Sequence, residues 1–321
     1  MHELIKGARI AVKTCMGVRQ GDSVLVVTDP PRLKVAEAIL EAARIVGAKT
    51  MLICMPTGTK HGGEPPKLVA NAMRTADVVL APTTYSLTHT RARLNACRFG
   101  ARVATMPMIT EEMMYRGAML ANYRDVEKLT KKIVARMDNA SRVEVTAPAG
   151  TKLNFSVRGR KAHSDTGIFH NPGDFGNLPA GEAFIAPIEG TADGKVVVDG
   201  SMDDTPQGRI EITIKKGMAR QISGRPTRKL IKMLEEAGPK ARNLAEFGIG
   251  TNPNARLIGN VLEDEKVLGT CHIALGDNST FGGKVRAGIH VDGIFLSPTV
   301  ELDGKIIMKK GKLRAGFGTK S

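Results

Sequence analysis

The first half of the chain alternates short runs of apolar residues with longer stretches in which apolar residues recur at helical spacing. The apolar runs, each typical of a buried strand, are residues 23–28, 50–55, 77–82 and 102–107. The amphipathic stretches, each of which predicts a helix, cover about residues 32–46, 66–75 and 88–99. Repeated strand–helix units predict a doubly wound parallel sheet with helices on both faces. We therefore predict an α/β layer domain over residues 1–140.

From about residue 141 the pattern changes to short alternating strands that are separated by glycine turns. The alternating segments are residues 142–160, 194–200 and 208–217. They predict an antiparallel or mixed sheet joined by hairpins. One helix is expected over about residues 225–237 and a short one near residues 260–266. We therefore predict a second, α+β domain over residues 141–321.

The composition agrees with two globular domains. The chain has 321 residues, with 47 Lys plus Arg against 32 Asp plus Glu, so its formal net charge is +15. A content of 42% hydrophobic and 25% charged residues excludes extensive disorder. Only 4% of the residues are aromatic and none is Trp, so few rings are present to stack on bases. We interpret the positive charge as a solvated basic surface and do not expect nucleic-acid binding.

The sequence shows no sign of a membrane or secreted protein. No stretch reaches the roughly 18 to 20 apolar residues that a membrane-spanning helix needs, and the N-terminus lacks the apolar core of a signal peptide. Cys15, Cys54, Cys97 and Cys271 are far apart and form no CxxC pair. This spacing argues against a zinc knuckle, a redox motif or a disulfide framework and favours small buried hydrophobes. We expect a cytoplasmic protein.

Doubly wound sheets bind ligands beyond the carboxyl ends of their strands, so the loops there are the first candidates for chemistry. No GxGxxG or Walker sequence occurs, which disfavours nucleotide binding. The loop after the third strand, residues 83–93, is rich in polar side chains and contains His89. One interpretation makes His89 a substrate-facing proton carrier or anion contact. The alternative is a polar cluster that caps the following helix.

Two glutamates of the second half lie in unusual surroundings. Glu182 follows an Ala-Gly pair and precedes a strand, so it either points into a cleft or faces solvent beyond a turn. Glu246 is flanked by apolar residues, and a buried carboxylate there would require a cation or a hydrogen-bond network. If Glu246 merely alternates outward from a strand, neither is needed.

Histidines supply the remaining candidate ligands. His272 lies in an apolar, strand-like run, where a lone histidine is commonly a satisfied core residue. His290 and Asp292 are two residues apart, a spacing that puts both side chains on the same face of a strand. Together with His272 and the two glutamates, Glu182 and Glu246, they predict a divalent-metal site of mixed nitrogen and oxygen ligands.

Several phrases of the second half resemble the thermophilic metalloprotease family, the aminopeptidase T and aminopeptidase S group. They are NLPAGEAFIAP, EFGIGTNPNA, DEKVLGTCHIALGDN, Gly282-Gly283 and the His290-x-Asp292 pair. The resemblance covers roughly residues 175–305 and implies a two-domain, homodimeric protein that carries one or two divalent metal ions, zinc, cobalt or manganese. It implies hydrolysis of N-terminal peptide bonds by metal-activated water. The metal ligands that it implies are Glu182, Glu246, His272, His290 and Asp292.

One departure from that family concerns a tyrosine that its peptidases use shortly after the histidine of the GTxHIALG segment. The corresponding stretch here, DNSTFGGKVRAG, has Ser279 and Phe281 but no tyrosine. The same superfamily contains iron enzymes that open a dihydroxypyridine ring and bind iron(II) through two histidines and one aspartate. In that alternative the resemblance implies a facial triad of His272, His290 and Asp292.

The two mechanisms assign different roles to the same residues. As a peptidase, the protein would use Glu182 or Glu246 as the base that takes a proton from the metal-bound water. As a dioxygenase, it would use His89 as acid or base toward an aromatic substrate. We therefore expect a cytoplasmic metallo-aminopeptidase that acts on a peptide or a small molecule, with an iron(II)-dependent ring-cleaving dioxygenase as the alternative.

Overall fold

The computed structural model describes residues 3–202 and 208–316. The chain folds into two compact units. Unit 1 is formed by the residues up to Arg124 together with Asp165–Ala180, and unit 2 by Asp125–Ser164 together with the residues from Gly181 onward. The chain thus passes from unit 1 to unit 2, returns, and passes to unit 2 again. The expected domain boundary between residues 140 and 141 stays a prediction.

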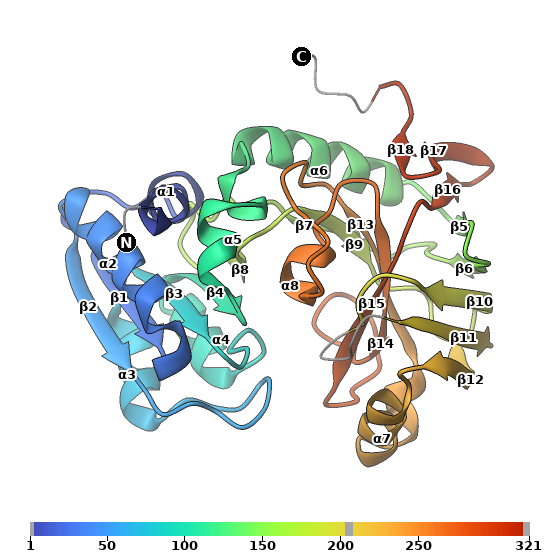
Figure 1. The fold of residues 1–321 in the computed structure, drawn as a ribbon, viewed down its shortest axis with the longest axis horizontal. Helices are drawn as coiled ribbons and strands as arrows, with labels where there is room; N and C mark the ends of the chain where they lie inside the picture. Colours follow the sequence, from blue (N-terminus) through green and yellow to red (C-terminus); the bar gives the residue numbers. More distant parts are fainter. Residues whose placement is uncertain (1–2, 203–207, 317–321) are drawn as a thin grey trace. The chain divides into compact units, whose positions relative to one another are not determined.

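Unit 1 contains a parallel five-stranded sheet, called sheet A here, with the order β2-β1-β3-β4-β8 (Figure 1). Its strands are β1 (Ser23–Thr28), β2 (Lys49–Cys54), β3 (Val78–Thr83), β4 (Arg102–Pro107) and β8 (Phe175–Asn177). Its helices are α1 (Leu4–Arg9), the π-helical η1 (Ile10–Cys15), η2 (Pro30–Arg32), α2 (Leu33–Ile45), α3 (Lys67–Thr75), α4 (Arg91–Arg98), α5 (Glu111–Tyr115) and η3 (Ala118–Leu120).

The burial of these elements explains why their sequence pattern is clear. Strand β3 is buried at every position and β4 at all but its first, as expected for inner strands of a sheet that is covered on both faces. Helix α2 buries Val35, Ile39 and Ala42, which recur at helical spacing. Strand β8 was not predicted, because it is three residues long and carries no apolar run.

Unit 2 contains two further sheets. Sheet B is antiparallel, with the order β12-β11-β10-β6-β5-β16-β17-β18, and sheet C has the order β15-β14-β13-β9-β7. The strands of sheet B are β5 (Arg142–Thr146), β6 (Lys152–Ser156), β10 (Asp193–Val198), β11 (Arg209–Lys215), β12 (Met218–Arg225), β16 (Thr299–Leu302), β17 (Lys305–Lys309) and β18 (Lys312–Leu313). Those of sheet C are β7 (His163–Asp165), β9 (Glu182–Ile185), β13 (Leu244–Gly250), β14 (Cys271–Gly276) and β15 (His290–Phe295). The helices that remain are α6 (Tyr123–Met137), which begins in unit 1 and runs into unit 2, α7 (Arg228–Glu236), η4 (Pro239–Arg242) and α8 (Val261–Asp264).

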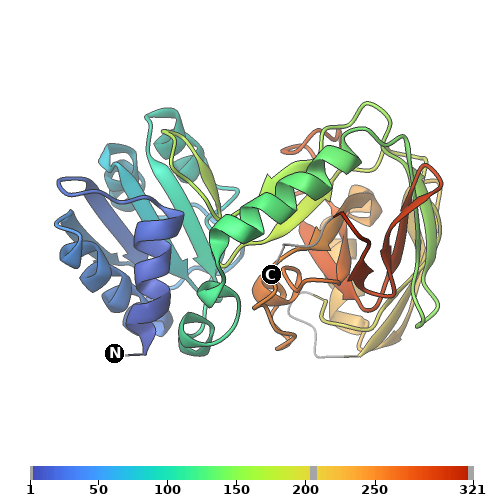
Figure 2. The same ribbon diagram turned by 90° about the horizontal axis from the view of Figure 1, so that it is seen from above.

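The core of unit 2 lies between sheets B and C, which face each other in Figure 2. Phe155 of β6 and Phe247 of β13 meet across it, with ring centroids 5.4 Å apart. Strands β13 and β14 are buried at every position. One face of sheet C thus packs in the apolar core, and polar side chains can gather only on its other face.

The prediction of an α/β fold is confirmed at the level of one parallel sheet followed by antiparallel sheets. Cys15 and Cys271 are buried as expected, whereas Cys54 is exposed and Cys97 is half-buried. Within the described residues, no helix combines the length and the apolar content that crossing a membrane requires.

Candidate metal centre

Sheet C brings the five predicted ligand residues together in unit 2. Glu182 begins β9, Glu246 is the third residue of β13, and His272 is the second residue of β14. His290 and Asp292 alternate along β15, so their side chains share a face, as the spacing predicted. The antiparallel register puts all five positions on that same face, opposite the face that carries the apolar core.

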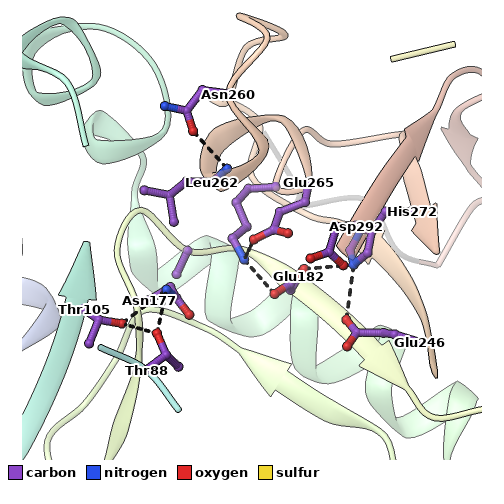
Figure 3. Close-up of polar contacts among 12 residues, drawn as sticks. Thr88, Thr105, Asn177, Glu182, Glu246, Asn260, Leu262, Glu265, His272 and Asp292 are labelled. Carbon is purple, nitrogen blue, oxygen red and sulfur yellow. Dashed lines mark hydrogen bonds and ion pairs between the residues drawn. The ribbon is translucent and has the colours of Figure 1, made fainter. Parts of the chain in front are cut away.

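The ligand atoms of these residues lie within a few ångströms of one another, and Figure 3 labels all of the residues except His290. His272 Nε2 is 3.2 Å from Glu182 Oε2 and 3.3 Å from Glu246 Oε1. The other oxygen of Glu246 is 3.4 Å from His290 Nε2, which is 3.5 Å from Asp292 Oδ1. The carboxylate of Glu246 therefore lies between the two imidazoles and contacts both.

The orientation of His290 is fixed from outside the cluster. Its Nδ1 lies 2.8 Å from the carbonyl oxygen of Asp277, so Nδ1 carries a proton and donates a hydrogen bond to that carbonyl. The Nε2 atom is then the one that faces Glu246 and Asp292. Such a backbone partner is typical of histidines that bind metals through the opposite nitrogen.

A glycine makes room for the second imidazole. Gly248 of β13 pairs with His272 of β14, and a Cβ at position 248 would overlap Nε2 and Cε1 of the His272 ring. Because β13 and its neighbours are buried and paired on both sides, the backbone has little freedom to relieve this overlap. The position of the His272 ring therefore depends on the absence of a side chain at position 248.

We expect Gly248→Ala to weaken binding of a divalent metal by about 10- to 100-fold, the cost usual when a group that orients a ligand is changed. Anaerobic titration with Mn(II), followed by calorimetry, measures this affinity. Gly58→Ala is the matched control, because its Cβ would meet the Tyr85 side chain at an ordinary distance of 3.7 Å. Unchanged affinity in a folded Gly248→Ala protein would contradict a role for His272 at the metal.

Contacts between carboxylates and imidazoles shift the pKa values of both toward the charged forms. Burial lowers the pKa of His272, but the hydrogen bond to Glu246 and the charges of Glu182 and Glu246 outweigh it and raise this pKa to about 9. Burial likewise raises the pKa of Glu246, yet hydrogen bonds from His272 and His290 bring it down to about 2. Without a metal, Glu246 is therefore an ionised carboxylate between two protonated imidazoles, those of His272 and His290.

This protonation predicts that metal affinity increases with pH. Ligation needs a neutral imidazole, whereas the charges of Asp292 and Glu246 raise the pKa of His290 well above its usual range, and the pKa of the neighbouring His272 is raised to about 9. Each imidazole proton that the metal displaces should make the apparent affinity for the metal increase about tenfold per pH unit, from about pH 6 to about pH 9. Calorimetry in buffers of different ionisation enthalpy counts these protons. Binding that releases none at pH 7 would contradict this description of the site.

The donor set fits a divalent cation. Among the described residues, the buried His272 Nδ1 has no hydrogen-bond partner, and the buried Glu182 Oε2 has only its ion-pair contact of 3.2 Å with His272 Nε2. Buried carboxylates without full pairing are costly, and a cation offsets that cost. In the part of the chain that the structure describes, three sets of side chains have ligand atoms close enough to hold one ion: Glu182 with Glu246 and His272; Glu246 with His290 and Asp292; and Glu265 with His272 and Asp292.

Two residues of the centre were not predicted from the sequence, Glu265 and Lys266. Lys266 is 1% exposed, and its Nζ lies 2.6 Å from both Glu182 Oε1 and Glu265 Oε1. Burial raises the pKa of Glu265 to about 8, although the charge of Lys266 opposes this. Both residues stand inside the quoted phrase DEKVLGTCHIALGDN, but nothing in the phrase indicates that this lysine is buried.

His89 belongs to unit 1 and is exposed. The residue before it, Thr88, shares a hydrogen bond of 2.6 Å with Thr105, and Asn177 donates to Thr105 at 3.3 Å (Figure 3). The residue after it, Thr90, caps helix α4 by accepting a hydrogen bond from the Arg93 amide. The loop thus contains the capping cluster that the sequence allowed, and a role of His89 in proton transfer stays a prediction.

Comparison with known proteins identifies the relatives of this chain. The family model described as NicX, 2,5-dihydroxypyridine 5,6-dioxygenase, matches residues 3–315. The 2,5-dihydroxypyridine 5,6-dioxygenase of Pseudomonas putida KT2440 is 23% identical over 265 residues, which cover 76% of this chain and 73% of that protein.

Two solved structures share the fold over almost the whole chain. The dioxygenase from Pseudomonas putida KT2440 has a TM-score of 0.82 at 22% identity, covering 97% of each chain. AmpT from Thermus thermophilus has a TM-score of 0.71 at 16% identity, covering 97% of this chain and 99% of its own.

These matches correct the main functional prediction from the sequence. The prediction that the chain belongs to the thermophilic metalloprotease family is wrong. The predicted aminopeptidase activity, the hydrolase class and the role in proteolysis are wrong with it, because both the matching family and the relative from Pseudomonas putida are described as dioxygenases. The physical reason for the error is that the sequence phrases used for the prediction form sheet C and its polar face. Such a scaffold does not determine which reaction takes place on it. The expected homodimer was implied by the metalloprotease resemblance alone and stays a prediction.

Proposed function

Because the chain belongs to the 2,5-dihydroxypyridine 5,6-dioxygenase family, we propose that it opens the ring of a 2,5-dihydroxypyridine-like aromatic with dioxygen, using one iron(II) ion. The match over residues 3–315 is the observation that carries this proposal, since it spans the ligand cluster and both units. The alternative that the sequence left open thus becomes the leading function.

The proposed iron ligands are Glu246, His290 and Asp292. Their ligand atoms form one compact set, and two of the three side chains are partly exposed, at 23% for His290 and 17% for Asp292. Iron(II) oxygenases commonly hold the metal with two histidines and one carboxylate and leave positions open, and this set differs from that pattern in having Glu246 in place of one histidine. The sequence placed His272 in this triad. The contact of His272 with Glu246 at 3.3 Å supports a neighbouring role, as a partner that orients Glu246 or as an additional ligand.

Bound iron(II) would hold a hydroxyl oxygen of the substrate and would relay electrons from the electron-rich ring to dioxygen. The protein's own groups prepare this arrangement. The Asp277 carbonyl orients the Nε2 atom of His290 toward the metal side, and Glu182 holds His272 from the other side. The proposed acid or base for the hydroxyl proton of the substrate is His89, an assignment that rests on the sequence alone.

Aromatic side chains next to the ligands support an aromatic substrate. The ring of Phe281 stands edge-on to His290, with centroids 5.7 Å apart, and Phe184 lies 5.6 Å from Phe281. His163 stacks on Phe184 at 5.3 Å. Offset and edge-to-face contacts are the arrangements that rings prefer, and a planar substrate bound beside His290 would add one more contact of this kind.

An oxygen electrode tests the proposal. Protein loaded anaerobically with iron(II) is mixed with 2,5-dihydroxypyridine in air-saturated buffer, and the ultraviolet absorbance of the substrate is followed in parallel. We expect one dioxygen molecule to be consumed for each ring opened, and no consumption with 2-hydroxypyridine, which lacks the second hydroxyl group. If iron-loaded protein consumes no oxygen with the dihydroxylated compound, the proposed function is wrong.

A further inference from the structure

We propose that Glu189, which lies outside the ligand cluster, is a positioning residue that orients His290 by fixing the loop of residues 277–289. This loop joins β14 to β15 and is called the 277–289 loop here. The proposal rests on the proposed function only in taking His290 as a metal ligand. It also gives a role to Gly282-Gly283, a glycine pair that the mechanism above does not use.

The 277–289 loop contacts the His290 side chain at two points. The carbonyl of Asp277 accepts the hydrogen bond from Nδ1 at 2.8 Å. The ring of Phe281, which is only 9% exposed, stands edge-on to the imidazole with centroids 5.7 Å apart. Because Nε2 lies across the ring from Nδ1, a shift of the loop would turn Nε2 away from the other ligands.

Asn278 stabilises the loop from inside. Its side chain is fully buried, and its Oδ1 accepts a hydrogen bond of 2.9 Å from the Val285 amide. Its carbonyl accepts another hydrogen bond, also of 2.9 Å, from the Gly283 amide. This packing requires a glycine at position 283, because a Cβ there would overlap the side-chain amide of Asn278. The second half of the loop thus packs against Asn278.

Glu189 connects this loop to the rest of unit 2. It lies between β9 and β10, and its Oε1 accepts hydrogen bonds from Asn278 Nδ2 at 3.0 Å and from the Lys284 amide at 2.8 Å. Its Oε2 pairs with Arg160, which also donates to the Gly282 carbonyl. Burial raises the pKa of Glu189, but these hydrogen bonds outweigh it and lower this pKa. The ionised carboxylate is thus a common acceptor for groups on both halves of the loop.

Few residues separate Glu189 from the imidazole. Asn278, which donates to Glu189, directly follows Asp277, and Asp277 supplies the carbonyl that accepts from His290. The carboxylate of Asp277 also accepts a hydrogen bond of 2.9 Å from the Ala287 amide, near the other end of the loop. Glu189 therefore acts on the His290 ring through two adjacent residues of the loop.

Glu189→Gln tests this inference. Since both oxygens of Glu189 accept from donors, an amide in place of the carboxylate sets its NH₂ group against a donor. We expect the affinity for Mn(II), measured by anaerobic calorimetry, to fall about 10- to 100-fold. In NMR spectra of metal-free protein labelled with ¹⁵N-histidine, the Nδ1 proton of His290 should exchange faster with water. The absence of this signal from His290→Ala assigns it.

The matched control is Glu211→Gln. Glu211 is also paired with two basic side chains, Arg209 at 3.1 Å and Lys195 at 3.4 Å, but it lies on sheet B. We expect this variant to keep the wild-type affinity for Mn(II) and the wild-type exchange of the His290 proton.

Two results would overturn the inference: a folded Glu189→Gln protein with wild-type affinity and wild-type proton exchange, or equal losses in Glu211→Gln. If Glu189→Gln fails to fold, Gly283→Ala displaces Asn278 within the loop and should weaken Mn(II) binding in the same way, and wild-type affinity in that variant would also overturn the inference. Oxygen uptake is recorded separately. Wild-type protein without oxygen uptake would contradict the proposed function alone, if Glu189→Gln shows the expected losses. Oxygen uptake by wild-type protein, with no change of affinity or exchange in Glu189→Gln, would contradict the role of Glu189 alone.

Discussion

Replacing His290 with alanine is expected to abolish stable metal binding and to lower the rate of ring cleavage by roughly 10³-fold or more, because a metal that activates a substrate supplies several kcal/mol. His290 contacts both Glu246 and Asp292 through Nε2 and is fixed by Asp277 through Nδ1. Its loss removes the nitrogen ligand of the proposed set. Metal content after desalting and oxygen uptake with the proposed substrate measure the two effects.

The control for this variant is His61→Ala. His61 is exposed in unit 1, where its ring contacts Tyr85 with centroids 5.3 Å apart. We expect this control to keep its metal and its activity. A His290→Ala protein that binds metal with wild-type affinity would mean that the ion is held elsewhere, and the proposed ligand set would be wrong.

Phe247→Ala is expected to cost about 3–5 kcal/mol of the free energy of unfolding, the range for a large aromatic side chain removed from a core. Phe247 is fully buried on the core face of sheet C and packs against Phe155. It follows Glu246 in β13, so the change should also disturb the ligand face. Urea unfolding of the metal-free protein measures the loss of stability without a contribution from bound metal.

The matched change is Phe99→Ala. Phe99 is 69% exposed and contacts Arg74 at its surface, so we expect a loss below about 1 kcal/mol. Equal losses for the two variants would show that the packing between sheets B and C does not dominate the stability of unit 2.

The elements predicted best from the sequence are strands with a continuous apolar run and helices whose buried residues recur at helical spacing. Strands β1 and β4 begin and end where the apolar runs do, and helix α2 differs by one residue at each end. The three-residue strand β8 was missed because it joins sheet A from a distant segment of chain and has no pattern of its own. Neighbours in a sheet that are brought together from far apart in the sequence leave no local signal.

In the candidate site, too, the residues indicated by local spacing were predicted, and those whose position depends on tertiary contacts were missed. The spacing of His290 and Asp292 fixed their common face through local geometry, and the structure brings Glu182, Glu246 and His272 to the same face. Lys266 and Glu265 were missed because burial of a charged side chain depends on tertiary pairing rather than on its neighbours in the chain. The reaction was predicted wrongly because the residues that bind a cation do not determine what the cation does.

Labelled dioxygen tests the central claim most directly. Iron(II)-loaded protein is given the proposed substrate under ¹⁸O₂, and the ring-opened product is analysed by mass spectrometry without delay, before its oxygens exchange with water. We predict that both labelled oxygen atoms appear in the product and that His290→Ala forms none of it. A product that carries no label would contradict ring cleavage by a dioxygenase and would require a different reaction for this site.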